Sequence, residues 1–582
     1  MLLVFVYVLV FFALSRLGLV HARHLLSFAG AGATAWGFHY WILPPQVSPA
    51  KPDSQATLAS LLVIGIAGAV LFVVTQPGYV LAGHDPIIVP TLAEALLSHA
   101  TTMDVYQPGD KGFTYPPGYP ILFSNIRLLL TPLQALIAFK TLTIILVLLL
   151  PVGWAWMARR IFLVPLPFWL ILLLSYVAIF GAERTVTFSL EHGKNAQMLA
   201  GAVFPFLIGL LLITMRNSIG LPFAVAALVG AILVHYSIFY MVVTFFTAYV
   251  LICFPRKRED WVALLRLGLV GILSLSVFVL LLRAAFNDPL AGTFGWPQPV
   301  EGMRRMADVL LRKLDELLFI FNGPGFSVYH SPYRGLFLIG CLLISLAIAY
   351  LLRGVHARSF AIGRMAGVWG IMLLIGIAFG TGVVQVGITP DYTRWYLIFP
   401  QAALMLAALC AVVLYARGEG RGARVASLAL IGVAILATVL AMSDLLWIAG
   451  VFRTQRMSQR ELINVRDVLA DAAPCFLITQ STTSADGMYT YQAYKPLEYA
   501  ETLTGCRILN GSFVQRGAPE GQAMDGLPTA AVLATLPASA AIFLVVPEPV
   551  EALYHAALPN AEFVRQEAQI GPLPIWRIRL GS

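Results

Sequence analysis

Long apolar runs separated by short polar segments dominate the first three quarters of the chain. A run of about 20 apolar residues is the length that an α-helix needs to cross the hydrocarbon core of a bilayer. About 13 such runs are present. They lie near residues 1–20, 25–46, 57–77, 133–157, 161–181, 196–215, 219–236, 237–254, 262–285, 334–352, 365–384, 395–416 and 425–450. The pattern predicts an all-α polytopic membrane bundle of about 13 transmembrane helices over residues 1–455.

The pattern changes beyond about residue 456. Apolar runs shrink to strand length in CFLITQ, AIFLVV and PIWRIRL, while RELINVRDVLADA and PVEALYHAAL have helical spacing. This predicts a small α/β domain over residues 456–582. Cys475 and Cys506 both lie in it, and they can form a disulfide if the domain faces an oxidising compartment.

Composition supports a membrane protein. Of the 582 residues, 59% are hydrophobic and 12% are charged, whereas a soluble protein carries about 25% charged residues. The net charge is 38 − 29 = +9, but the basic residues lie in short clusters between apolar runs, which indicates topology and not nucleic-acid binding. The chain has no Walker loop, GxGxxG, HExxH or CxxC motif, so ATP hydrolysis and dinucleotide chemistry are not expected.

The basic clusters orient the predicted helices. Loops rich in Lys and Arg stay on the cytoplasmic side, and all of the clusters after the third run fall on one side. The opposite, outer side then holds residues 78–132, 182–195, 286–333, 385–394 and the C-terminal domain. The first hairpin fits less well, because Arg16 and Arg23 would lie on the outer side. The clusters are Arg159 and Arg160; Arg216; Arg256, Lys257 and Arg258; Arg353, Arg358 and Arg364; and Arg417, Arg421 and Arg424.

The first long outer loop, 78–132, is the most polar and the earliest. It carries His84-Asp85 at the exit of a predicted span. A capping-box pattern from Thr91 to Glu94 predicts a short helix through Leu97, lying along the membrane surface. Asp104, Lys111 and the turn from Tyr115 to Tyr119 follow.

A carboxylate at the mouth of a membrane helix is costly unless it is solvated or used, which makes Asp85 a candidate for chemistry. Asp85 followed by Pro86 also fits the start of a helix, with Asp as N-cap. Asp104 fits a site residue or a solvated loop aspartate, and Tyr115 fits a loop-shaping or a substrate-contacting residue.

Two shorter outer loops add charged groups. Glu191, His192 and Lys194 precede one span and suit an anionic ligand, although they also fit an interfacial charge cluster. Glu191 and His192 can alternatively join Asp85 in holding a divalent ion. Another group opens the span near 395–416. It consists of Asp391, Tyr392 and Arg394; the planar guanidinium of Arg394 suits a phosphate, and snorkelling to the interface is the alternative.

These features together resemble the GT-C type of membrane glycosyltransferase, which uses polyprenyl-phosphate sugars. The resemblance rests on the many spans, the early outer loop opening with Gly83-His84-Asp85, the turn Tyr115-Pro-Pro-Gly-Tyr119 and the outer α/β domain. The loop is also similar to that of the actinobacterial galactan arabinofuranosyltransferases. The chain lacks the Asp-Glu or Asp-Asp pair common in related first loops and the WWD motif of the oligosaccharyltransferase catalytic subunit.

The resemblance implies a mechanism for particular positions. Asp85 would supply the general base on the acceptor hydroxyl or orient it. His84 and Asp104 of the same predicted loop are the other candidate catalytic residues. Arg394, with Lys194 or His192, would stabilise the departing lipid phosphate. Glu191, Asp391, Tyr392, Lys111 and Tyr115 complete the predicted substrate-binding set. No nucleotide is implied, and a divalent metal stays open.

The leading functional prediction is transfer of a sugar from a polyprenyl-phosphate donor to a glycan, lipid or protein acceptor. The reaction is expected on the outer face of a plasma membrane, with the bacterial inner membrane favoured by the Ala-, Gly- and Arg-rich composition. A transporter or lipid flippase is the main alternative, and it would require inverted repeats and mid-membrane charges, of which Lys140 is the main example. An O-antigen ligase or polymerase is a further transferase alternative, and a catalytically dead scaffold is the last.

Overall fold

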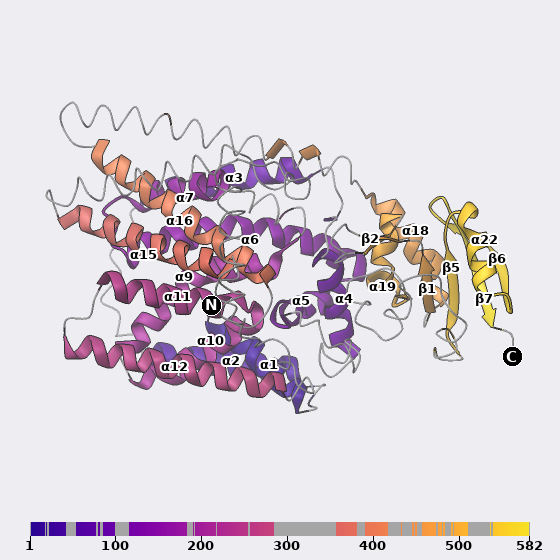
Figure 1. Ribbon diagram of the computed structural model, residues 1–582, viewed down its shortest axis with the longest axis horizontal. Coiled ribbons are helices and arrows are strands. Elements are labelled where there is room, and N and C mark those ends of the chain that lie inside the picture. The colour runs from indigo at the N-terminus through magenta and orange to yellow at the C-terminus, as the bar shows by residue number, and fades with distance from the viewer. Residues whose placement is uncertain are drawn as a thin grey trace, which may run out of the picture.

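The structure of the chain is a computed structural model with a helical part followed by a C-terminal sheet (Figure 1). It describes residues 2–17, 19, 22–41, 54–76, 80–81, 85–98, 116–182, 190, 193–216, 218–253, 257–283, 357–380, 390–416, 432, 445–446, 449–450, 457–472, 475–479, 481–483, 490–492, 494–509, 533, 536 and 539–580.

The helical part is built from apolar helices that run side by side along the long axis in Figure 1. Four described helices are long and apolar enough to cross a membrane, over Ser54–Thr75, Pro132–Arg160, Asn195–Met215 and Arg258–Leu281. Several shorter apolar helices accompany them, so the chain is a multi-pass membrane protein. The helices are α1 (Leu2–Arg16), α2 (Arg23–Trp41), α3 (Ser54–Thr75), α4 (Asp85–Ser98), α5 (Gly118–Leu129), α6 (Pro132–Arg160), α7 (Phe168–Ala182), α9 (Asn195–Arg216), η2 (Ser218–Gly220), α10 (Leu221–Val234), α11 (Ser237–Cys253), α12 (Arg258–Arg283), α15 (Ala357–Gly380) and α16 (Pro390–Ala416).

Most of the predicted spans coincide with these helices. The two predicted near 334–352 and 425–450 lie wholly or mostly outside the described residues, so the predicted count of about 13 spans stays a prediction. The structure confirms a mostly helical, membrane-type fold with a small C-terminal sheet. α7 begins at Phe168, later than predicted, because Pro165 and Pro167 lack the backbone N–H that helical turns need.

Among the described helices, the ends that carry basic residues lie away from the C-terminal sheet. α6 and α9 end at Arg160 and Arg216, and α12 begins at Arg258. Arg266 near the start of α12 donates a hydrogen bond to the carbonyl of Met215 at the end of α9, which places these ends together. The opposite end of α6 instead packs on the C-terminal domain through Leu133 and Leu136.

Two charged residues of the helical part have structural roles. Lys140, the charge predicted within a span, donates a hydrogen bond of 2.7 Å to the carbonyl of Thr75. Thr75 is the last residue of α3, and a cation there complements the negative end of the helix. Arg23, predicted near the outer end of the first hairpin, is buried over the ring of Phe11 and donates to Ser15.

The C-terminal domain is a mixed five-stranded sheet in the order β4-β1-β5-β7-β6. β4, β1 and β5 are parallel, and β7 and β6 add antiparallel hairpin strands at one edge. In the register of β1 and β5, Leu477 lies beside Phe543. A separate β2-β3 hairpin completes the strands. The elements are α18 (Gln459–Leu469), η4 (Ala470–Ala472), β1 (Cys475–Thr479), β2 (Ser481–Thr483), β3 (Thr490–Gln492), η5 (Lys495–Tyr499), α19 (Ala500–Thr504), β4 (Arg507–Ile508), β5 (Ala541–Val545), α22 (Glu548–Ala557), β6 (Ala561–Ile570) and β7 (Leu573–Leu580).

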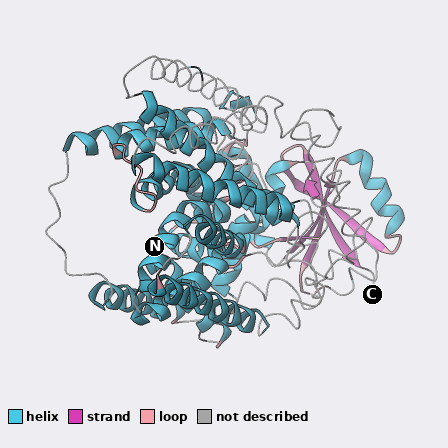
Figure 2. Cartoon of the chain, turned by 60° about the vertical axis from the view of Figure 1, so that its left-hand side comes forward, coloured by secondary structure: helices cyan, strands magenta, loops and turns pink. Residues whose placement is uncertain are grey.

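Both faces of this sheet are covered, as Figure 2 shows. Alternate residues of β1 point to opposite sides: Leu477 packs with α18 and α19, whereas Phe476 and Ile478 pack with α22. The predicted strands and helices of the tail are all present. The sequence pattern missed β6, because most of the side chains of this edge strand are at least partly exposed and its polar residues break the alternation.

Candidate functional site

The N-terminal ends of four helices meet on the side of the bundle that carries the C-terminal domain. α4 begins at Asp85, α5 at Gly118, α9 at Asn195 and α11 at Ser237. Contacts between the first residues of these helices, described below, bring the ends together. The N-terminal end of a helix carries a partial positive charge and unpaired backbone N–H groups, so four such ends create a site suited to negative charge.

Asp85 and Lys194 form an ion pair at the centre of this meeting point. The Lys194 Nζ lies 2.7 Å from the Asp85 Oδ1, and the two side chains are only 19% and 7% exposed. Asp85 lies at the positive end of α4, where a carboxylate is favourable. Lys194 directly precedes α9, where a cation is unfavourable unless an anion compensates it. The Asp85 carboxylate therefore compensates the Lys194 ammonium at the positive end of α9.

The start of α4 differs from the sequence prediction. A helix beginning at the Thr91 capping box was expected, but α4 already begins at Asp85. Pro86 favours this start, because its fixed φ suits a first turn and its missing N–H is not needed there. Thr91 and Glu94 therefore lie inside α4 and do not cap its start. Thr91 instead bonds to Thr502 of the C-terminal domain, and Glu94 pairs with Arg127.

Asn195 joins α9 to α5 and α6. Its Nδ2 donates to the Tyr119 hydroxyl at 2.9 Å and lies 3.4 Å from the Phe139 carbonyl. The Asn195 Oδ1 is buried and has no hydrogen-bond partner among the described residues. Burial raises the pKa of Tyr119, and the negative charge of Asp85 raises it further. Tyr119 thus stays a neutral hydroxyl close to the carboxylate.

His235 lies in the short joint between α10 and α11, beyond the ends of both helices. Its Nδ1 is 2.6 Å from the Ser237 hydroxyl. Burial lowers the pKa of His235 to about 3, and the positive charge of Lys194 contributes to the decrease. The ring is therefore neutral at pH 7. Only its position near Lys194 links His235 to the site.

Two glycines allow the helix ends to approach this closely. A Cβ on Gly118 would lie 2.7 Å from backbone atoms of Val234, which precedes the α10–α11 joint. Gly193 has φ +60, and a Cβ there would lie 2.5 Å from the Pro86 ring. Both contacts involve groups that cannot easily move, so these positions require glycine.

The structure brings Asp85 and Lys194 together but does not describe most of the other predicted site residues. Arg394 lies in the second turn of α16, and Phe399 of the same helix contacts Gly201 in α9. The side chains of Asp391, Tyr392 and Arg394 lie outside the described residues. The remaining predicted residues also lie outside them. These are His84, Asp104, Lys111, Tyr115, Glu191 and His192.

A metal site is not formed by the described part of the chain, in which no three His, Cys, Asp or Glu residues gather. The predicted ligands Glu191 and His192 fall outside that part. The possible divalent ion therefore stays a prediction. The cation that does contact Asp85 is the ammonium of Lys194.

Comparison with known proteins supports a fold class. No family model and no curated protein sequence matches the chain. The crystal structure of apo ArnT from Cupriavidus metallidurans matches with a TM-score of 0.52 at 13% identity, covering 90% of this chain and 98% of that chain. ArnT from the same organism bound to undecaprenyl phosphate matches with a TM-score of 0.50, 13% identity and the same coverage, 90% and 98%.

At 13% identity, the similarity is evidence for a shared fold. The chain has the fold of a GT-C type membrane glycosyltransferase, the class that includes ArnT. The resemblance predicted from the sequence is thus confirmed at the level of architecture. The match spans both the helical part and the C-terminal domain, because it covers nearly the full length of both chains.

Proposed function

We propose that the protein is a membrane glycosyltransferase that transfers a sugar from a polyprenyl-phosphate donor to a glycan, lipid or protein acceptor. The observation that carries the proposal is the buried Asp85–Lys194 pair at the meeting point of four helix N-termini. A neighbour of the same fold, ArnT, binds undecaprenyl phosphate. The partial positive charges of the helix ends suit a lipid phosphate, and the carboxylate suits an acceptor hydroxyl.

In this mechanism Asp85 orients the acceptor hydroxyl and accepts its proton. The hydroxyl oxygen forms a bond to the anomeric carbon while the bond from that carbon to the phosphate oxygen breaks, and polyprenyl phosphate leaves. Lys194 holds the carboxylate in position and offsets negative charge as the phosphate departs. Arg394, which is carried by the first turns of α16, is the second proposed phosphate contact. Asn195 offers its Oδ1 as an acceptor for a substrate hydroxyl.

We also propose that the site and the C-terminal domain face the outside of the plasma membrane, in bacteria the inner membrane. The Arg-rich helix ends lie opposite the C-terminal domain, as a cytoplasmic location for those ends would require. The domain contains a Cys475–Cys506 disulfide, which persists in oxidising compartments. In intact cells, a membrane-impermeant maleimide should label Asp467→Cys and leave Lys257→Cys unlabelled until the cells are permeabilised; the reverse pattern would invert the proposed topology.

Transfer is tested with the full chain in nanodiscs. A panel of radiolabelled undecaprenyl-phosphate hexoses and pentoses is supplied with a membrane fraction as acceptor, and release of undecaprenyl phosphate is measured. Asp85→Asn should lower turnover by about 100-fold or more, because general-base catalysis contributes about that much, while undecaprenyl phosphate still binds by native mass spectrometry. Asp467→Asn is the matched control, since Asp467 is an exposed aspartate of α18.

Full activity of Asp85→Asn would refute the mechanism. Failure of the wild-type protein to bind undecaprenyl phosphate would refute the function. Movement of labelled undecaprenyl phosphate across a liposome membrane without any sugar transfer would support the transporter alternative.

A further inference from the structure

A short segment of the C-terminal domain holds the chain on both sides of Asp85. This segment, residues 495–504, consists of η5 and α19. The buried Tyr499 hydroxyl donates a hydrogen bond to the carbonyl of Leu81, four residues before Asp85. The Thr502 hydroxyl shares a buried hydrogen bond of 2.8 Å with Thr91, six residues after Asp85. The two bonds therefore bracket the candidate catalytic carboxylate.

Apolar contacts follow the same arrangement. Val80 and Ile87, which flank Asp85 in the sequence, are buried in the core of the C-terminal domain, together with Tyr499 and Leu503. Ile88 and Val89, the next residues of α4, are instead buried in the core of the helical part. The chain around Asp85 therefore belongs to two cores. The position of α4 therefore depends on where segment 495–504 lies.

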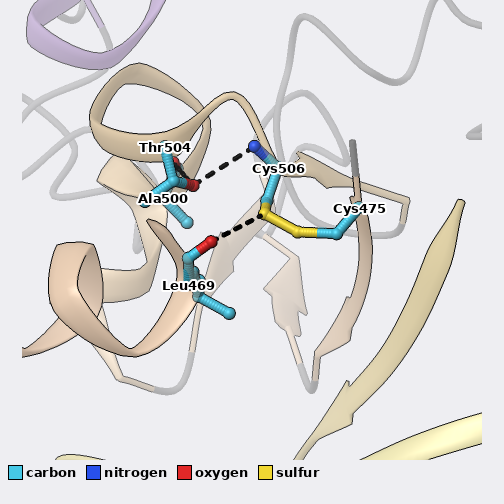
Figure 3. The surroundings of a disulfide bond; sticks show 5 residues. All are labelled: Leu469, Cys475, Ala500, Thr504 and Cys506. Carbon is cyan, nitrogen blue, oxygen red and sulfur yellow. Dashed lines mark hydrogen bonds between the residues drawn. A yellow bond between two sulfur atoms is a disulfide. The ribbon is translucent and has the colours of Figure 1, made fainter. Parts of the chain in front are cut away.

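A disulfide fixes segment 495–504 to the sheet. α19 ends at Gly505, whose φ of 78 closes the helix, and Cys506 follows directly. Cys506 is bonded to Cys475, the first residue of strand β1 (Figure 3). Its backbone N–H also donates to the Thr504 hydroxyl, and its Sγ lies 3.9 Å from the carbonyl of Leu469 at the end of α18. The disulfide thus connects α19 to both the strand and the helix beneath it.

We propose that segment 495–504 positions Asp85 for the reaction, and that the Cys475–Cys506 disulfide holds this segment in its working place. Tyr499 and Thr502 are positioning residues in this arrangement, since they act on Asp85 through their hydrogen bonds to Leu81 and Thr91. The inference rests on the proposed glycosyl transfer for its kinetic consequence. Its structural consequence, the order of α4, does not depend on that function.

The first test removes the two hydrogen bonds. Tyr499→Phe/Thr502→Val in the full chain should lower kcat about tenfold with KM for the undecaprenyl-phosphate sugar unchanged, because a displaced catalytic group lowers the rate of the bound complex. Thr502→Ser keeps the hydroxyl and should retain wild-type kcat. Thr247→Val is the matched control, because Thr247 lies outside segment 495–504 and its exposed hydroxyl bonds to the carbonyl of Val243 within α11.

A second readout needs no substrate. Hydrogen exchange of the backbone amides of residues 85–98 should become about tenfold faster in Tyr499→Phe/Thr502→Val, and it should stay at the wild-type rate in Thr247→Val. Reduction of the wild-type protein with a phosphine should produce the same acceleration. A Cys475→Ala/Cys506→Ala protein should show the faster exchange from the start and should not respond to the phosphine.

The outcomes separate the inference from the proposed function. Unchanged exchange over residues 85–98 in both the double variant and the reduced protein would overturn the inference. A raised KM with unchanged kcat would also overturn it, since the segment would then bind substrate. If exchange accelerates as expected while the wild-type protein transfers no sugar from any donor, the positioning role stands and the proposed function fails.

Discussion

The Asp85–Lys194 ion pair makes a quantitative prediction about stability. At 2.7 Å between the Lys194 Nζ and the Asp85 Oδ1, two unit charges attract by about 6 kcal/mol at an effective dielectric constant of about 20. Desolvation offsets most of this gain, so the intact pair adds little net stability. Removing only the cation is different, because the buried Asp85 carboxylate then loses the ammonium that lies 2.7 Å away, at a cost of up to about 3–5 kcal/mol.

Lys194→Met should therefore destabilise the protein by about 3 kcal/mol, the lower end of that range, because Lys194 keeps some exposure. Asp85→Asn should cost about 1–2 kcal/mol, because the amide oxygen still accepts a hydrogen bond from the ammonium. The Asp85→Asn/Lys194→Met protein lacks both of these charges and should also lose about 1–2 kcal/mol. The double variant should thus be more stable than Lys194→Met alone.

The assay is reversible unfolding of the full chain in mixed micelles, with tryptophan fluorescence as the signal from the buried Trp154 and Trp369. The exposed pair of Arg565 and Glu548, at 2.8 Å, is the control, and each of its single variants should cost less than about 1 kcal/mol. If the double Asp85/Lys194 variant loses the sum of the two single losses to within about 0.5 kcal/mol, the two charges are not coupled and the reasoning is wrong.

Two further predictions concern helix packing and pH. Gly230→Ala in α10 should destabilise by about 1–3 kcal/mol, since its Cβ would collide with the backbone of Phe5 in α1. Gly268→Ala in α12 has nothing within 4 Å and should be neutral or stabilising by up to about 1 kcal/mol; equal unfolding midpoints for the two variants would contradict the close α1–α10 contact. Because the folded pKa of His235 is about 3 and its unfolded pKa is about 6.5, the stability tied to its neutral form should be complete above pH 6.5 and decline as the pH falls toward 3. His235→Gln should flatten this decline in melting temperatures measured between pH 7 and pH 4, and an unaltered pH profile would exclude His235 as its source.

The sequence by itself determined the architecture. An apolar run of membrane-spanning length is expected to form an α-helix, because a helix pairs all of its backbone N–H and C=O groups within its own segment, where lipid offers no partners. Strand-length apolar runs likewise predicted the C-terminal sheet; the run at Cys475–Thr479 is buried at every position, as a strand covered on both faces must be. β6 escaped this reasoning because most of its side chains at the edge of the sheet are at least partly exposed to water.

Only the tertiary structure decided the composition of the site. The sequence identified Asp85 and Lys194 separately, from their charges at the ends of predicted helices, and predicted that Lys194 binds a phosphate. The ion pair between them joins residues 109 positions apart and depends on how α4 and α9 pack. Asn195 and Tyr119 were not predicted, because an amide and a phenol in apolar surroundings carry no periodic signal. The hydrogen bonds of Tyr499 and Thr502 to the chain around Asp85 join residues more than 400 positions apart. The local sequence determines which residues are charged and which apolar faces are buried. Contacts between distant segments arise only when complete helices and sheets pack, because no local pattern connects the residues that this packing brings together.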